Sequence, residues 1–180
     1  VSLLFSLPGK PLLRYGDEIA MADNLRLPGR ESVRTPMQWV NRPNGGFSNA
    51  PVKQLKHRAI EGETGYEQIN VLDALNNEGS LLNWIKQLIS IRKQCQEIIE
   101  EKIELIETDH PSIMAYAYRN EKHMLVIVHN LSGEPVVIGK KELRQQDTTL
   151  YCLLSDEPVS DESEQIAMNS YSYKWFKIFL

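Results

Sequence analysis

The stretch Arg34-Thr-Pro-Met-Gln-Trp39 lies inside a longer run, LPGRESVRTPMQWVNRPNGGFS, which extends from Leu27 to Ser48. Proline and glycine recur in this run too often for a helix or for a strand in the middle of a sheet, so the run is predicted to be a loop. Loops held by a rigid scaffold often carry the groups that bind or react. This stretch is therefore the first candidate for a functional site.

Two interpretations of the loop follow from its side chains. The guanidinium of Arg34 offers a planar set of donors that can bind neighbouring hydroxyl groups or a carboxylate. The rings of Trp39 and Phe47 offer flat apolar faces on which a sugar can stack. Alternatively, Trp39 fills the edge of a core and Arg34 pairs with a nearby acid. The residues taken alone favour this second, structural interpretation.

Several motifs, in a fixed order along the chain, point to one enzyme family. They are the segment from Phe5 to Ile19, Asp23-Asn24, Arg34 to Trp39, Gly65-Tyr-Glu67, Ile69-Asn-Val71, Ser80 to Trp84, Leu88-Ile89, Ile91-Arg-Lys93 and Tyr171 to Phe176. Together they resemble the α-amylase family of glycoside hydrolases. Within it they are similar to the branch of trehalose synthases (maltose α-D-glucosyltransferases) and oligo-1,6-glucosidases. The resemblance covers essentially the whole chain.

The resemblance implies that residues 1–95 are the C-terminal end of a (β/α)8 barrel of the TIM type. The apolar run from Pro11 to Tyr15 would be the last barrel strand. Asp17 and Glu18 would then lie at its C-terminal end, the face on which such barrels place their active sites. Residues 22–78 would form a long loop, and the aromatic residues in it favour an ordered, functional loop.

Residues 80–94 have the pattern of an amphipathic helix. Leu81, Ile85 and Leu88 recur at the helical spacing and predict one apolar face. Ser80 is a suitable N-cap, because its hydroxyl can accept a hydrogen bond from the first turn. By resemblance, this helix is the last one of the barrel.

After Glu100 the chain changes to short alternating segments separated by turn residues, which predict an antiparallel β-sandwich over residues 96–180. The expected fold is therefore α/β followed by all-β, with the boundary between residues 95 and 96. We expect Trp175 or Phe176 in the last strand to be buried. The expected strands are 103–106, 113–118, 123–130, 136–138, 149–154, 165–168 and 173–179.

The catalytic acids of the family are not expected in this chain. Retaining glycoside chemistry needs two carboxyl groups about 5–5.5 Å apart, one as nucleophile and one as acid/base. In the family these acids lie on barrel strands upstream of the segment that this chain resembles, and their motifs do not occur here. We therefore expect no catalytic residue in the chain and no turnover from it alone. The N-terminal part of the barrel is expected from the same protein.

Three residues are candidates for binding a sugar. By resemblance, Arg34 lies near the sugar at the point of cleavage, and Arg30 is a weaker candidate. Phe47 is a candidate for shielding the site from water, which would otherwise divert a glycosyl intermediate to hydrolysis. Packing within the loop explains Phe47 equally well.

The resemblance implies first an enzyme that converts maltose to trehalose by intramolecular glucosyl transfer with retention. The alternative among enzymes is a hydrolase of the α-glucosidase or oligo-1,6-glucosidase type. Outside the enzymes, the chain could be a carbohydrate-binding or scaffold module, or part of a transporter subunit. The expected ligands are maltose, trehalose or short α-glucans, and the choice between isomerase and hydrolase stays open.

Composition argues against several other partners. A net charge of −4 argues against nucleic acid, which attracts basic surfaces. No apolar run approaches the roughly 20 residues that span a bilayer, so we expect no membrane partner. Cys95 and Cys152 do not suggest a disulfide framework and fit a reducing, cytoplasmic compartment. We expect no metal and no cofactor, and the oligomeric state stays open.

Overall fold

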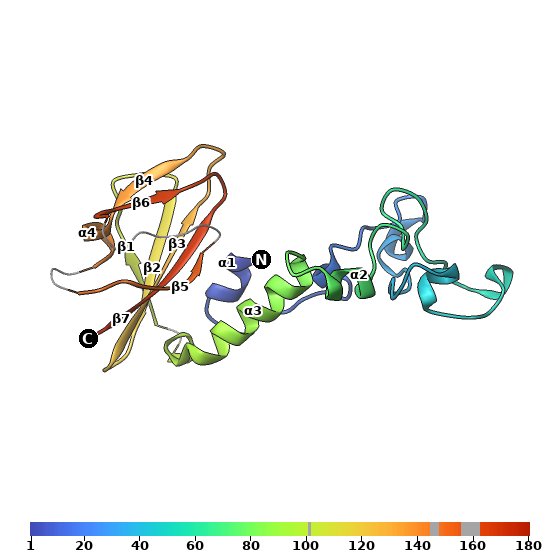
Figure 1. Ribbon diagram of the computed structural model, residues 1–180, viewed down its shortest axis with the longest axis horizontal. Coiled ribbons are helices and arrows are strands. Elements are labelled where there is room, and N and C mark those ends of the chain that lie inside the picture. Colours follow the sequence, from blue (N-terminus) through green and yellow to red (C-terminus); the bar gives the residue numbers. More distant parts are fainter. Residues whose placement is uncertain (101, 145–147, 156–162) are drawn as a thin grey trace. The chain divides into compact units, whose positions relative to one another are not determined.

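The structure is a computed structural model that describes residues 1–100, 102–144, 148–155 and 163–180 (Figure 1). The chain divides into two compact units. We call the first, which consists of Val1–Pro11 and Leu88–Leu180, the β unit. We call the second, which consists of Leu12–Gln87, the loop unit.

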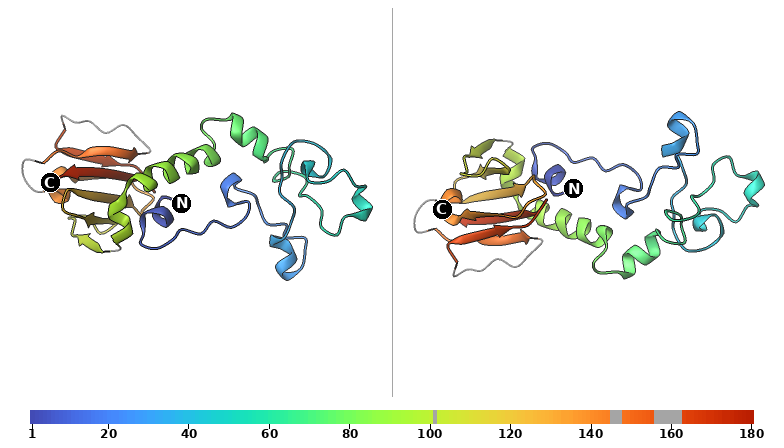
Figure 2. Two further views of the ribbon diagram at one scale, coloured as in Figure 1. Left: turned by 90° about the horizontal axis from the view of Figure 1, so that it is seen from below. Right: turned by 90° about the horizontal axis from the view of Figure 1, so that it is seen from above.

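The β unit contains a five-stranded antiparallel sheet with the strand order β1-β2-β3-β7-β5 (Figures 1 and 2). β1 and β5 are its edges, and β5 has a bulge between Cys152 and Leu154. β2 and β3 are consecutive antiparallel strands and form a hairpin. All five strands lie where the alternating sequence predicts them. They are β1 (Ile103–Ile106), β2 (Ile113–Arg119), β3 (His123–Asn130), β5 (Tyr151–Ser155) and β7 (Tyr173–Phe179).

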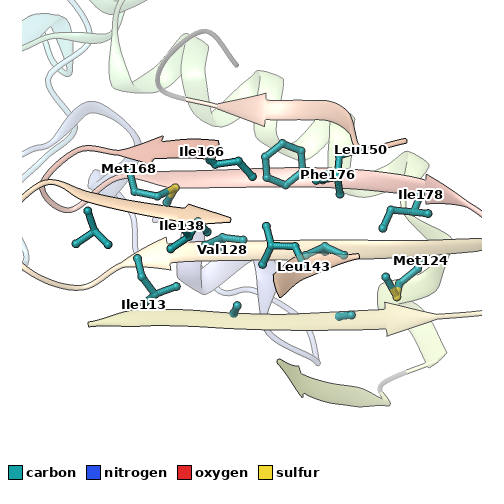
Figure 3. Close-up of a cluster of buried hydrophobic side chains, with 14 residues drawn as sticks. Ile113, Met124, Val128, Ile138, Leu143, Leu150, Ile166, Met168, Phe176 and Ile178 are labelled. Carbon is teal, nitrogen blue, oxygen red and sulfur yellow. The ribbon is translucent and has the colours of Figure 1, made fainter. Parts of the chain in front are cut away.

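A second, two-stranded antiparallel sheet pairs β4 (Val136–Gly139) with β6 (Gln165–Met168). The short helix α4 (Lys140–Leu143) follows β4 directly. Side chains of both sheets and of α4 form one buried apolar cluster (Figure 3). Burial of each large aliphatic or aromatic side chain stabilises the fold by about 1.5–3 kcal/mol relative to exposure. This cluster is therefore a large source of stability in the β unit.

The two aromatic residues at the centre of β7 are both fully buried, on opposite faces of the sheet. Phe176 belongs to the apolar cluster (Figure 3). Trp175 points the other way, because successive side chains of a strand alternate between its faces. Its Nε1–H donates a 3.0 Å hydrogen bond to Oγ of Ser2 in α1 (Ser2–Ser6). The prediction that an aromatic residue of the last strand is buried is confirmed for both.

The contact between α1 and the large sheet is a buried polar network. Oγ of Ser2 lies 3.1 Å from Nε2 of His129, and the phenol of Tyr118 donates a 2.6 Å hydrogen bond to the carbonyl of Ser6. Burial lowers the pKa of His129 to about 4. His129 is therefore neutral at pH 7, when its imidazole can take part in the network without the cost of a buried charge.

Before residue 70 the loop unit contains only short 3-10 helices, which agrees with the long loop expected there. These are η1 (Asp17–Ile19), η2 (Gly29–Val33), η3 (Pro43–Gly46) and η4 (Val52–Gln54). The loop ends earlier than expected, at α2 (Val71–Asn76).

Residues 11–15 do not form a strand, contrary to the expectation from sequence. Leu12 and Tyr15 are exposed, and no described strand pairs with this segment. A buried parallel strand needs neighbouring strands to bond its backbone groups, and the described residues provide none here. The segment ends at Gly16, whose φ of 96° lies in the left-handed region that favours glycine.

Helix α3 (Leu81–Gln94) begins where the sequence predicts it. Oγ of Ser80 accepts a 3.2 Å hydrogen bond from the backbone N–H of Asn83, which confirms the N-cap. Ile85 and Leu88 of the predicted apolar face are buried. In the described parts of the chain, no helix is both long and apolar enough to cross a bilayer.

Candidate functional site

A hollow of about 480 Å³ lies in the loop unit beside residues 33–36. Arg34 and Phe47 both line it, so the structure brings two of the three candidate residues together. Arg30, by contrast, is exposed within η2 and is not part of the lining. The lining also includes Tyr15, Leu55, Lys56 and His57. None of the described lining residues carries a carboxylate, so the hollow offers donors and apolar surface rather than an acid/base pair.

Arg34 follows η2 directly, and its side chain is 56% exposed. Its Nη1 lies 3.5 Å from Oε1 of Glu31, whose other carboxylate oxygen lies 3.2 Å from Nδ1 of His57. An exposed ion pair of this kind contributes only about 0–1 kcal/mol, so the guanidinium can leave Glu31 for a ligand at little cost. The ion pair agrees with the structural interpretation of Arg34. Trp39, by contrast, is 46% exposed, which disagrees with the interpretation that it fills the edge of a core.

Phe47 is held by an unusual turn and is 51% exposed. The three residues before it, Asn44, Gly45 and Gly46, all have positive φ angles of 60°, 63° and 70°. A Cβ on Gly46 would lie only 2.5 Å from Cγ2 of Val40, so only glycine fits there without a shift. The side chain of Asn44 closes the turn by donating to the carbonyls of residues 48 and 50, at 2.8 and 2.9 Å.

Tyr15 joins the lining through a contact that the sequence does not reveal. Its phenol oxygen accepts a 2.8 Å hydrogen bond from the backbone N–H of Met37, in the middle of the 34–39 stretch. The sequence predicts Tyr15 only as the last residue of a strand. The signal that could have identified it is its place in a family motif, next to Gly16.

Gln38 holds residues 34–39 in place through hydrogen bonds of its side chain. Its side chain is 0% exposed, and its Nε2 donates to the carbonyl of Ile69 at 2.5 Å and to that of Thr64 at 3.4 Å. The backbone carbonyl of Gln38 accepts a hydrogen bond from the N–H of Val71 at 2.9 Å. The backbone carbonyl of Trp39 accepts one from the N–H of Leu72 at 3.0 Å. The stretch therefore satisfies the first two N–H groups of α2, which have no partner inside the helix.

Helix α2 is fixed at both ends by side-chain hydrogen bonds. At its start, Oδ1 of Asn70 accepts from the N–H of Asp73 at 2.9 Å. At its end, Oγ of Ser80 donates to the carbonyl of Ala74 at 2.6 Å. Nδ2 of Asn83, in the first turn of α3, donates to the same carbonyl at 3.1 Å. This chain of contacts links the lining of the hollow to two helices.

The acids nearest to residues 11–15 are bound to local groups. Oδ2 of Asp17 accepts from the backbone N–H of Arg14 at 2.9 Å, and Oε2 of Glu18 accepts from that of Gly16 at 2.9 Å. The guanidinium of Arg14 also contacts Asp23 at 3.2 Å. Over the described ranges, no group of three or more His, Cys, Asp or Glu side chains could hold a metal ion.

The comparison with protein families agrees with the resemblance seen in the motifs. Residues 1–101 match the model of the alpha-amylase catalytic domain. The chain belongs to the alpha-amylase family. The matched region contains the whole loop unit, including Arg34, Phe47, Tyr15 and Gln38.

Trehalose synthases are among the similar proteins of known function. The trehalose synthase of Pimelobacter sp. is 31% identical over 185 residues, which cover 98% of this chain and 32% of that protein. Trehalose synthase/amylase TreS of Mycolicibacterium smegmatis is 40% identical over 116 residues, or 64% of this chain and 20% of that protein. The chain thus spans about a third or less of the length of these relatives.

Solved structures share the fold at lower identity. The crystal structure of trehalose-6-phosphate hydrolase (TreA) from Bacillus licheniformis superposes with a TM-score of 0.78 at 20% identity, covering 99% of this chain and 38% of that one. A mutant isomaltulose synthase from Erwinia rhapontici, in complex with D-glucose, gives a TM-score of 0.73 at 19% identity. The match covers 98% of this chain and 37% of that one.

Proposed function

We propose that this chain is the C-terminal part of a trehalose synthase, which converts maltose to trehalose by intramolecular glucosyl transfer with retention at the anomeric carbon. The observation that carries this proposal is the alignment with a trehalose synthase over 98% of the chain. In this proposal, residues 1–95 are the end of the catalytic (β/α)8 barrel, with α3 as its last helix. Residues 96–180 are a C-terminal β-sandwich domain.

In the proposed reaction, the catalytic carboxyl groups and the sugar-binding residues of this chain come from different parts of the protein. A retaining double displacement needs a nucleophilic carboxylate and a second carboxyl group as acid/base. The described lining of the hollow has no carboxylate, so these groups are proposed to come from the part of the enzyme to which this chain is joined. The 180-residue chain is accordingly expected to have no activity by itself.

We assign Arg34 and Phe47 to the sugar-binding part of the site. The exposed guanidinium has free donors for sugar hydroxyl groups, and its ion pair with Glu31 is weak enough to be exchanged. Phe47 would exclude water from the glycosyl intermediate, which favours transfer over hydrolysis. Arg30 is the weaker candidate, because it lies outside the lining.

A hydrolase is the second candidate, because an oligo-1,6-glucosidase of Bacillus cereus is 24% identical over 168 residues, or 93% of this chain. Both enzymes would bind a glucosyl unit in the same place and differ in whether a sugar or water accepts it. The ligands proposed for this chain are maltose, trehalose or short α-glucans, as solved relatives hold glucose or sucrose. A cytoplasmic location is part of the proposal.

The proposed function is tested by incubating the full-length protein with maltose and measuring trehalose and glucose separately. Trehalose as the main product supports the synthase. Glucose as the main product supports a hydrolase, and no conversion of maltose would rule out the synthase. The 180-residue chain is assayed in parallel and is expected to release neither sugar.

In the full-length enzyme, Arg34→Ala is expected to lower kcat/KM for maltose by about 10- to 150-fold. This corresponds to the loss of a charge-assisted contact of about 1.5–3 kcal/mol. Arg34→Lys should be almost as poor, because one ammonium group cannot replace a planar set of donors. The melting temperature should hardly change, since the side chain is exposed.

The matched control is Arg42→Ala, another exposed arginine of the same loop that lies outside the lining. It should leave kcat/KM within about twofold of the wild type, as expected for a surface substitution. If Arg34→Ala instead keeps its activity and loses thermal stability, Arg34 is a structural ion-pair partner and the binding role is wrong.

A further inference from the structure

The buried amide of Gln38 has a role that its contacts define closely. Nε2 donates to two carbonyl oxygens, those of Ile69 and Thr64, at 2.5 and 3.4 Å. Only the NH₂ end of the amide can donate to carbonyls, so these two acceptors fix its orientation. They belong to a segment 26 and 31 residues further along the chain. The side chain of Gln38 therefore ties the 34–39 stretch to the segment that leads into α2, in addition to the backbone hydrogen bonds of Gln38 and Trp39 with the start of α2.

The backbone between Gln38 and Arg34 is restrained at each step. Thr35, Pro36 and Met37 are all buried. The proline ring fixes one φ angle, and the N–H of Met37 donates to Tyr15 at 2.8 Å. A displacement of Gln38 would therefore be passed on to Arg34 rather than absorbed by a flexible linker.

We propose that Gln38 is a positioning residue for the sugar site. It does not touch the sugar; it holds the backbone of residues 34–39 against the 64–69 segment, so that the guanidinium of Arg34 faces the hollow. This rests on the proposed sugar-binding role of Arg34. The substitution of Gln38 is expected to act on sugar binding through Arg34, and not on the chemical step.

The test uses the full-length enzyme with maltose as the probe. Gln38→Met keeps the length of the side chain but removes the donor, and KM is expected to rise roughly tenfold while kcat changes less than about threefold. Gln38→Glu places an acceptor against two carbonyls and should raise KM further. Gln54→Glu makes the same change at an exposed position of the loop unit and should leave KM unchanged.

A double-mutant cycle separates positioning from a general loss of structure. If Gln38 acts through Arg34, the Arg34→Ala, Gln38→Met double variant has the same KM as Arg34→Ala alone. Additive effects, or an unfolded Gln38→Met variant by circular dichroism, would overturn the positioning role. An Arg34→Ala variant with wild-type KM would instead count against the sugar-binding role of Arg34, and a full-length enzyme that forms no trehalose from maltose would count against the synthase, so these failures are distinguishable.

Discussion

Replacing Trp175 with alanine is expected to lower the free energy of unfolding of the 180-residue chain by about 3–5 kcal/mol. The indole is 0% exposed, and its removal leaves a large cavity between the sheet and α1. It also leaves Oγ of Ser2 without the donor that lies 3.0 Å away. Because domains are stable by only about 5–15 kcal/mol, this loss would remove a large share of the free energy of unfolding.

Circular dichroism during urea unfolding measures this effect without relying on tryptophan fluorescence. Trp175→Phe restores most of the volume but not the N–H donor, so it separates packing from the hydrogen bond. Leu105→Ala in β1 is the matched control, because this side chain of the same sheet is 76% exposed. It should change stability by no more than about 0.5 kcal/mol. A Trp175→Ala chain as stable as this control would show that α1 does not pack on the sheet.

Acidification is expected to destabilise the β unit by about 3 kcal/mol through His129 alone. Its pKa falls from 6.5, the ordinary value that applies in the unfolded chain, to about 4 in the fold. Between these two values the unfolded chain binds more protons, so stability decreases as the pH falls. The stability that depends on a neutral His129 is fully present above pH 6.5 and is lost by about pH 4.

The comparison of wild type with His129→Gln isolates this contribution from other acid-sensitive groups. Glutamine does not titrate, so the stability advantage of the wild type at pH 7.5 should shrink by about 3 kcal/mol as the pH falls to 4. His110→Gln, at an exposed turn, is the control and should show no such change. Parallel pH profiles for wild type and His129→Gln would mean that His129 is not buried as a neutral group.

The strands were predictable because their signal is local. Residues 113–119 and 123–130 are nearly continuous apolar runs rich in Ile, Val and Tyr, so both strands could be predicted from their own residues. Residues 11–15 have a similar apolar content but no neighbouring strand, and a strand cannot form without one. Helix α4 was missed because a single turn of charged residues gives no periodic signal.

The candidate residues came from the family resemblance, because the residues taken alone favoured a structural role for Arg34. Arg34 and Phe47 both line the hollow, whereas Arg30 lies outside it. Tyr15 and Gln38 were missed because their roles depend on partners 22 and 31 residues away. Both residues lie in motifs that resemble the family, but a motif does not show which distant group a side chain contacts.

The two edges of the large sheet bear on how the protein behaves at high concentration. An exposed edge can capture a strand from another molecule and start aggregation. Here β1 has only four residues and carries the exposed, negatively charged Glu104, while the bulge between Cys152 and Leu154 interrupts the register of β5. Each edge is thus a poor template for a further strand, which disfavours the growth of the sheet into fibrils.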